Sequence, residues 1–224
     1  MKCGGMNLKV IRLVNQLMNS NCFIIVDNIS NSCIIIDPAS EDSKREIKFI
    51  EDHSLKLDYI ILTHAHADHC WGVNTLKKQF PDMKLVFCDD KYQKREIMLF
   101  FRMWHEDVNY SFDLIPADIL IEDNRTINWH GHEIRFVLTP GHSLGSMCID
   151  IEGMLFTGDT IMPFPPYFNG RGSNKEEWVS SVKKIENKYN PETKIYPGHG
   201  DEMTLGEWMG NENFQDINNN KFDV

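Results

Sequence analysis

The sequence contains no apolar run near the roughly 18 residues that a transmembrane helix requires. Its first residues, "MKCGGMNLKVIRL", contain no apolar stretch of the ~7–15 residues that form the centre of a secretory signal, and Cys3 is a poor candidate for lipid attachment. Six cysteines are scattered without a CxxC pair, which argues against a thiolate zinc site and a disulfide framework. We therefore expect a cytoplasmic protein with reduced thiols and no membrane partner.

Clustered positive charge is also scarce. The formal net charge is −10, and short runs such as "KKQF" look like the solvated faces of helices. Because phosphate backbones are held mainly by clustered Lys and Arg, this charge balance argues against nucleic acid as a partner. A small substrate that is neutral or modestly anionic fits better, and the oligomeric state is expected to be a monomer or a homodimer.

What is present is an ordinary globular composition. Hydrophobic residues make up 42 % of the 224 positions and charged residues 25 %, which excludes disordered and fibrous classes. This length buries a substantial core without disulfide staples. We predict one domain over residues 1–210, followed by a frayed, Asn-rich tail over residues 211–224.

Hydrophobic patterning predicts strands and then a helix once in each half of the chain. Three short strands, with a hairpin near residues 27–32, precede a helix that Ser40 or Asp42 caps, and a β–α–β unit follows with its helix at residues 68–80. Residues 91–111 form a helical, aromatic-rich insertion or lid-like loop. A series of five strands follows, the first of which begins at Ile119, and a helix at residues 175–189 precedes the strand "TKIYP". Two sheets packed face to face, with helices outside both, would bury this α+β pattern.

Metal-binding side chains gather in "LTHAHADHCWG", directly after an apolar strand. His64 and His66 project to one side of an extended segment, since residues i and i+2 share a face there. Asp68 and His69 follow where the chain turns into a helix. Imidazole and carboxylate groups are the usual ligands of zinc, iron and manganese.

Three further residues have the same setting, each at the end of an apolar strand and beside glycine. They are His142 in "TPGHSLG", Asp159 in "LFTGDT" and His199 in "YPGHG". Glycine permits the sharp bends that bring backbone close to a site. Five histidines and two aspartates exceed the four ligands of a closed zinc site and suit two ions that share a bridging carboxylate. The other four histidines, at positions 53, 105, 130 and 132, lack this setting.

The motifs "THAHADH", "TPGHSLGS", "FTGDT" and "YPGHG", in this order, resemble the metallo-β-lactamase superfamily. The segments around His142 and His199 look most like its single-domain, glyoxalase II-like hydrolases. The resemblance implies a four-layer αββα sandwich. It assigns His64, His66 and His142 to one metal and Asp68, His69 and His199 to the second, with Asp159 bridging them.

The same resemblance implies the activity. A hydroxide between two divalent ions, most simply zinc with iron or manganese as alternatives, would attack the carbonyl of a thioester, ester or lactone, so Asp68 and Asp159 are assigned as catalytic. Two departures bear on the substrate. The chain stops soon after His199, where glyoxalase II enzymes continue into a helical domain that helps bind glutathione, and "IMPFPPYFNGRGSN" replaces a shorter segment after Asp159. Tyr167, Arg171 and His105 are the candidate substrate-binding residues.

Two other functions remain open at this point. The persulfide dioxygenases share the early histidine motif but bind a single iron, so the number of metals per chain separates them from hydrolases. A non-catalytic metal-binding module would be expected to have lost ligands, and none is lost here. A serine or cysteine nucleophile has less support, because no GxSxG elbow is present and Cys70 reads as a small residue on the helix after the ligands.

Overall fold

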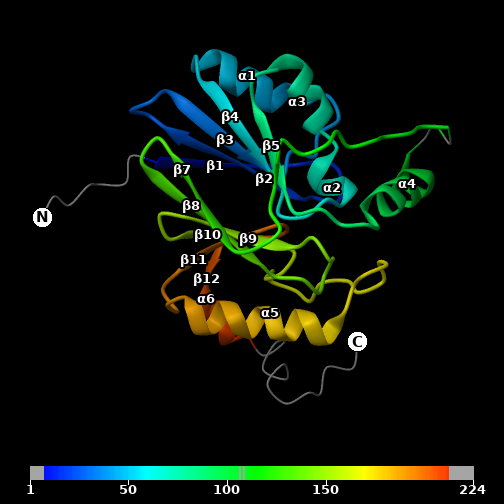
Figure 1. Ribbon diagram of the computed structural model, residues 1–224, viewed down its shortest axis with the longest axis vertical. Helices are drawn as coiled ribbons and strands as arrows, with labels where there is room; N and C mark the ends of the chain where they lie inside the picture. Colours follow the sequence, from blue (N-terminus) through cyan, green and yellow to red (C-terminus); the bar gives the residue numbers. More distant parts are fainter. Residues whose placement is uncertain (1–7, 106, 108, 212–224) are drawn as a thin grey trace, which may run out of the picture. The chain divides into compact units, whose positions relative to one another are not determined.

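The computed structural model describes residues 8–105, 107 and 109–211. The chain divides into two compact units, residues 1–122 and residues 123–224, and each unit has its own sheet and its own helices (Figure 1). The prediction that residues 1–210 act as one domain stays a prediction. The predicted frayed tail lies almost entirely outside the described residues.

The first unit has a six-stranded sheet in the order β1-β2-β3-β4-β5-β6. The antiparallel part confirms the predicted meander: β1 (Leu8–Val14), β2 (Asn21–Asp27) and β3 (Ser32–Ile36). The parallel part continues through β4 (Lys56–Ile61), β5 (Lys84–Phe87) and β6 (Ile119–Leu120). Parallel neighbours need crossover connections, which here contain α1 (Lys44–Asp52), α2 (Ala67–Cys70), α3 (Val73–Gln79) and α4 (Gln93–Trp104).

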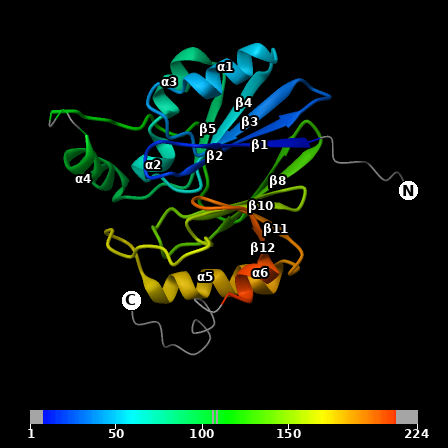
Figure 2. The same cartoon turned by 180° about the vertical axis from the view of Figure 1, so that it is seen from behind.

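The core of this unit lies between one face of the sheet and its helices. Alternate residues of β2, namely Cys22, Ile24 and Val26, pack with Ile50 of α1 and Leu76 of α3. Figure 2 shows α1 and α3 along the same side of this sheet. The remaining residues of β2 and β3 are buried as well, which explains why these strands read as continuous apolar runs.

Two local predictions in the first unit are wrong. The helix after Pro38 begins beyond both predicted caps, since Ser43 stands at the cap position with a left-handed φ of 44° and makes no side-chain cap bond. Its hydroxyl oxygen instead lies 2.9 Å from the carbonyl oxygen of Ser40 and 3.3 Å from that of Gly72, and its single proton is shared between these two acceptors. The predicted helix at residues 68–80 is two helices that part at Gly72, where a Cβ atom would lie 2.5 Å from Ser43 Oγ. Close packing between these two loops therefore sets both boundaries.

The second unit has a six-stranded sheet in the order β12-β11-β10-β9-β8-β7. Its strands are β7 (Arg125–Trp129), β8 (His132–Leu138), β9 (Met147–Ile151), β10 (Met154–Gly158), β11 (Lys194–Pro197) and β12 (Met203–Thr204). The strands β10 and β11 pair in parallel and are connected through α5 (Lys175–Lys188), and α6 (Leu205–Met209) follows β12. Trp178 of α5 and Trp208 of α6 are buried against the sheet and form the centre of this core.

Each unit thus supplies one sheet and one set of helices, the layers that the predicted αββα arrangement requires. The α+β class is confirmed. The order of strands and helices agrees with the prediction, except that two helices replace the one at residues 68–80 and that β12 and α6 follow the last predicted strand. Within the described part of the chain, no helix combines the length and the apolar character needed to cross a membrane.

Candidate metal centre

The first half of the candidate centre lies at the end of β4 in the first unit. His64, His66, Asp68 and His69 follow this strand, and α2 begins between His66 and Asp68. The imidazole ring centroid of His64 lies 4.6 Å from that of His66 and 4.2 Å from that of His69. The predicted gathering of the three rings at one strand end is therefore present within this unit.

Asp37, a residue that the sequence reasoning missed, orients this half. It directly follows β3, is buried, and lies 3.0 Å from the Nδ1 atom of His69 through its Oδ2 atom. The backbone N–H of Thr63 donates to Asp37 Oδ1 at 2.8 Å, and the Thr63 hydroxyl donates to Oδ2 at 2.6 Å. An Nδ1–H bond to this carboxylate directs the Nε2 lone pair of His69 away from Asp37, as in the carboxylate–histidine pairs around protein-bound metals.

Thr63 fixes the neighbouring imidazole in the same way. Its Oγ1 atom lies 3.1 Å from His64 Nδ1. Because the single hydroxyl proton goes to Asp37, the Thr63 oxygen accepts from an Nδ1–H of His64. The Nε2 atom of His64 is thus assigned as its metal ligand, so one buried carboxylate sets the tautomers of two histidines.

The Asp68 and His69 side chains have the separation expected of two ligands on one ion. Asp68 Oδ2 lies 3.8 Å from His69 Nε2, which is too long for a hydrogen bond. Two ligand atoms that each lie ~2.0–2.1 Å from one tetrahedral ion are roughly 3.4 Å apart.

The second half of the candidate centre is in the second unit, and His142 is its first member. The ring of His142 is buried, and its Nδ1 atom lies 3.1 Å from the carbonyl oxygen of Tyr167, which again assigns Nε2 as the ligand atom. Gly141, just before it, has φ +138°, and a Cβ there would lie 2.3 Å from the backbone of Trp178. The start of α5 therefore holds the His142 loop, and only glycine fits at that contact.

Asp159 is the central residue of this half. It follows β10 and is buried. Its Oδ2 atom lies 3.5 Å from His142 Nε2 and 3.7 Å from His199 Nε2. Each separation is close to that between two ligand atoms on one ion. One oxygen of Asp159 could therefore share an ion with either histidine.

His199 completes the second half, in the short loop after β11. Gly200, which follows it, has φ +79°, and a Cβ there would lie 2.7 Å from Pro163 Cγ. The ring of Phe164 lies 6.5 Å from the ring of His199. The predicted glycine-framed strand ends therefore place His142 and His199 around the carboxylate of Asp159.

The candidate substrate-binding residues are more dispersed. Tyr167 contributes its carbonyl group to His142, while its side chain is 80 % exposed. Arg171 is also exposed. His105 belongs to an aromatic cluster in the first unit, stacked on Tyr110 with ring centroids 3.8 Å apart. Their assignment to substrate binding stays a prediction.

Cysteine chemistry at this site is disfavoured by burial. Cys70 is fully buried at the end of α2, and desolvation raises the pKa of its thiol well above the usual value, with further increases from the charges of Asp68 and Asp37. A thiol that remains protonated at neutral pH is a poor nucleophile and a poor ligand. This environment agrees with the prediction that Cys70 is a small packing residue on the helix after the ligands.

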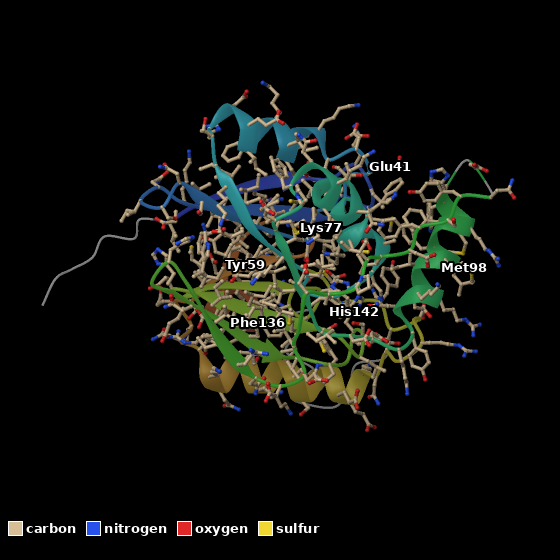
Figure 3. The ribbon with its side chains drawn as sticks, turned by 45° about the horizontal axis from the view of Figure 1, so that its top comes forward. Glu41, Tyr59, Lys77, Met98, Phe136 and His142 are labelled. Atoms are coloured by element: carbon tan, nitrogen blue, oxygen red, sulfur yellow. The ribbon has the colours of Figure 1, made fainter. Side chains whose placement is uncertain are left out.

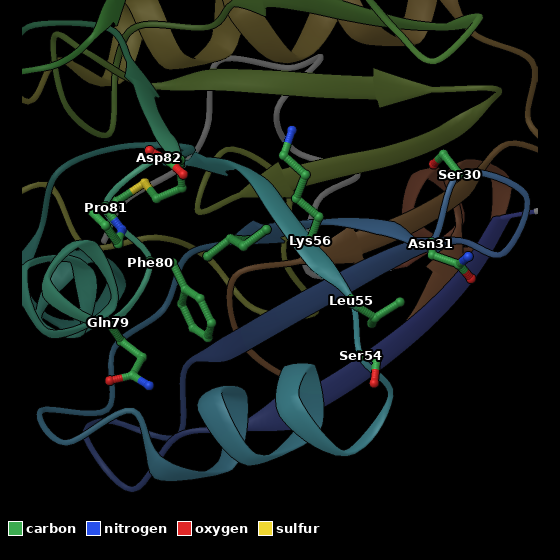
Figure 4. A pocket seen from close by; sticks show the side chains of 11 residues that line it. Ser30, Asn31, Ser54, Leu55, Lys56, Gln79, Phe80, Pro81 and Asp82 are labelled. Carbon is green, nitrogen blue, oxygen red and sulfur yellow. The ribbon is translucent and has the colours of Figure 1, made fainter.

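A surface hollow in the first unit has no part in the candidate centre. Figure 4 shows it beside the starts of β3 and β4, where Ser30, Lys56, Phe80 and Asp82 are among its lining residues. The candidate metal-binding histidines of this unit, His64, His66 and His69, follow the other end of β4. The hollow contains no histidine or cysteine, so its chemistry does not suit a transition metal.

Comparison with known proteins identifies related sequences. The family model described as the metallo-beta-lactamase superfamily matches residues 16–199. The chain is 30 % identical to the probable polyketide biosynthesis zinc-dependent hydrolase BaeB of Bacillus velezensis, over 94 % of this chain and 84 % of that protein. It is 29 % identical to the hydroxyacylglutathione hydrolase of Pelagibacter ubique (84 % and 70 %). It is 28 % identical to the atrochrysone carboxyl ACP thioesterase of Aspergillus fumigatus (83 % and 52 %).

Solved structures show the same fold. The BLEG-1 B3 metallo-beta-lactamase superposes with a TM-score of 0.80 at 21 % identity, covering 92 % of this chain and 99 % of that one. ETHE1 from Myxococcus xanthus superposes with a TM-score of 0.74 at 18 % identity, covering 96 % and 92 %. At these identities the likeness establishes the fold alone, and it confirms the predicted fold class.

Proposed function

The chain belongs to the metallo-β-lactamase superfamily, and from this membership we propose that it is a metal-dependent hydrolase that uses two divalent ions to cleave a thioester, ester or lactone. The two halves described above would together supply the seven ligands. His64, His66 and His142 would hold one ion, and Asp68, His69 and His199 the other. Asp159 would bridge them.

The observation that carries this proposal is the position of Asp159 Oδ2. This one oxygen lies 3.5 Å from His142 Nε2 and 3.7 Å from His199 Nε2. These two histidines would bind different ions. A carboxylate needed only as a partner for one imidazole would lie within hydrogen-bond range, below about 3.2 Å. The longer, paired separations support a bridging role.

When bound, the ions would supply Lewis acidity and lower the pKa of a bound water molecule to about 7. The chain contributes orientation. Asp37 and Thr63 hold His69 and His64 with their Nε2 atoms as ligands, and the Tyr167 carbonyl group does the same for His142. Water adds to the acyl carbon, and the thiol, alcohol or ring oxygen leaves with the proton.

Among the three substrate classes, a thioester is best supported. The curated relatives include one named as an ACP thioesterase and another named as a hydroxyacylglutathione hydrolase, and an acyl group on the thiol of glutathione is a thioester. A thiolate is a good leaving group and needs little protonation from the protein. Zinc is the proposed metal because the relative from Bacillus velezensis is named as zinc-dependent, with iron or manganese as alternatives.

Replacement of the bridging residue tests this proposal. Asp159→Asn keeps the shape of the side chain and removes its charge. Loss of a residue that only orients a ligand costs about 10–100-fold, so loss of a bridging ligand is expected to lower kcat for thioester hydrolysis by more than a hundredfold. Metal content should fall below two ions per chain while the circular dichroism spectrum stays unchanged.

Asp150→Asn is the matched control. Asp150 is a buried carboxylate in the same unit, where it accepts from the backbone N–H of Gly153 and lies beside Arg135. This variant should keep both metals and its turnover. Full hydrolysis by the Asp159 variant would refute the bridging role.

The alternative is a mononuclear iron persulfide dioxygenase, and the structural likeness to ETHE1 is compatible with it. It requires one iron per chain, consumption of oxygen and no thioester hydrolysis. The hydrolase requires two metals and no oxygen. Metal analysis with an oxygen electrode on one purified sample separates them.

A further inference from the structure

Four residues form an outward surface on α4, here called the α4 face: Arg95, Met98, Leu99 and Arg102. Their spacing of i, i+3, i+4 and i+7 places them on one side of the helix. Met98 is 42 % exposed and Leu99 38 % exposed, and both arginines are exposed as well. Figure 3 shows Met98 on the outer side of α4.

The opposite side of α4 already supplies its packing. Ile97 and Phe101 are buried in the core of the first unit, and Phe100 packs against that core. The helix is therefore held without the α4 face. Exposed Met and Leu side chains between two arginines form an amphipathic surface that is suited to a partner helix.

The helix also stands beside the candidate centre. It packs against α2, the element that carries Asp68 and His69. Trp71, directly after α2, lies 4.9 Å from Phe101 between ring centroids and donates from its indole N–H to the hydroxyl of Tyr110 at 2.6 Å. A partner bound at the α4 face would therefore be anchored next to the first half of the metal centre.

The charge of α4 is opposite to that of the chain. The chain carries a formal charge of −10, whereas α4 contains three basic residues and one acidic residue. Lys94 pairs with Asp113 at 2.9 Å. Among the residues that the structure describes, neither Arg95 nor Arg102 pairs with a carboxylate. An acidic partner would be repelled by the molecule as a whole and attracted to this helix, which would fix its orientation.

We propose that the α4 face docks an acidic, helical carrier protein that delivers the acyl group as a thioester on a flexible arm. This inference rests on the proposed thioester hydrolysis and names its substrate class. Arg95 and Arg102 would pair with carboxylates of a carrier helix, and Met98 and Leu99 would cover its apolar side chains. The flexible arm would carry the thioester from the docked carrier to the neighbouring metal centre.

The first test measures binding without catalysis. The probe is an acidic acyl carrier protein with its phosphopantetheine arm but no acyl group, titrated into the full-length, metal-loaded protein with fluorescence anisotropy as the readout. Charge reversal in Arg95→Glu/Arg102→Glu is expected to weaken Kd by at least tenfold. Lys48→Glu/Lys78→Glu makes the same change of net charge on exposed positions of α1 and α3 and should weaken Kd by less than twofold.

The second test compares two substrates that differ only in their carrier. One is the octanoyl thioester of the same carrier protein, and the other is the octanoyl thioester of N-acetylcysteamine. The Arg95→Glu/Arg102→Glu variant should lose at least tenfold in kcat/KM for the first substrate and stay within twofold for the second. Added salt should lower kcat/KM for the carrier substrate alone, since exposed charge pairs are screened.

The outcomes separate docking from the proposed function. Hydrolysis of both thioesters without any effect of charge reversal would overturn the docking proposal and leave the hydrolase intact. Hydrolysis of neither would refute the proposed thioester hydrolysis, and the binding titration would still decide docking. If the carrier does not bind, two results would overturn the carrier proposal in favour of another occupant of the α4 face. One is binding to vesicles that contain phosphatidylglycerol, and the other is dimerisation that charge reversal abolishes.

Discussion

Asp37 gives the sharpest prediction about how this chain prepares its ligands. Its two oxygens accept three hydrogen bonds, from the Thr63 backbone, the Thr63 hydroxyl and His69 Nδ1, at 2.8, 2.6 and 3.0 Å. Asp37→Asn keeps the side-chain shape. It also keeps the backbone, because Asn tolerates the left-handed φ of 54° found here.

The amide cannot satisfy all three donors. If its oxygen faces the Thr63 backbone, its NH2 group faces His69 Nδ1 and favours the tautomer with the proton on Nε2, the proposed ligand atom. If the amide is flipped, two N–H groups oppose each other in a buried site. Loss of such an orienting partner typically lowers metal affinity 10–100-fold, or about 1.4–2.7 kcal/mol.

The assay is a zinc competition titration against a chelator, with thioester hydrolysis measured on the same samples. Asp37→Asn should weaken one zinc 10–100-fold and lower turnover at limiting zinc. Asp27→Asn is the control, since Asp27 is equally buried in the same unit but accepts from Ile29 and Ser30 in a turn. Unchanged affinity for both zinc ions in the Asp37 variant would refute this account of ligand orientation.

Two further predictions concern stability. Gly141→Ala adds a Cβ 2.3 Å from the Trp178 backbone at φ +138°, so we expect the free energy of unfolding to fall by about 2 kcal/mol or more and Tm by roughly 4 °C or more. The control is Gly153→Ala, which also has a positive φ but no atom near the added Cβ; it should lose less stability, and equal losses in the two variants would count against the Trp178 clash. Burial raises the pKa of the Glu46 carboxyl, so the folded chain retains a proton that the unfolded chain releases near pH ~4.3, and stability falls as pH rises through the raised value. Glu46→Met should therefore raise Tm by a few degrees at pH 8, consistent with ~1–3 kcal/mol for a buried polar group, and by less at pH 4; a gain independent of pH would contradict this reasoning.

The strand-end pattern made much of the candidate centre predictable. Histidine and aspartate beside glycine, directly after apolar strands, indicated His142, Asp159 and His199. In the structure the two histidines lie around one carboxylate oxygen of Asp159. Asp37 has the same strand-end position in "CIIIDP". It lacks a neighbouring glycine or histidine, and its role depends on bonds to residues 26 and 32 positions later in the chain.

The wrong predictions for the start of α1 and for the helix at residues 68–80 also arise from contacts between residues far apart in the chain. Ser40 and Asp42 are good capping residues by type, yet Ser43 stands at the start of α1 because its hydroxyl contacts Gly72. The break between α2 and α3 depends on that same contact. Patterns along the chain report which face of an element is apolar, whereas contacts between distant loops decide where an element ends.

The most direct test of the two-metal hydrolase is a zinc titration of the metal-free protein, with bound zinc per chain and thioester hydrolysis followed together. The account predicts that hydrolysis rises as the second zinc binds and reaches its plateau at two zinc ions per chain. A plateau at one ion per chain, or hydrolysis without metal, would contradict it.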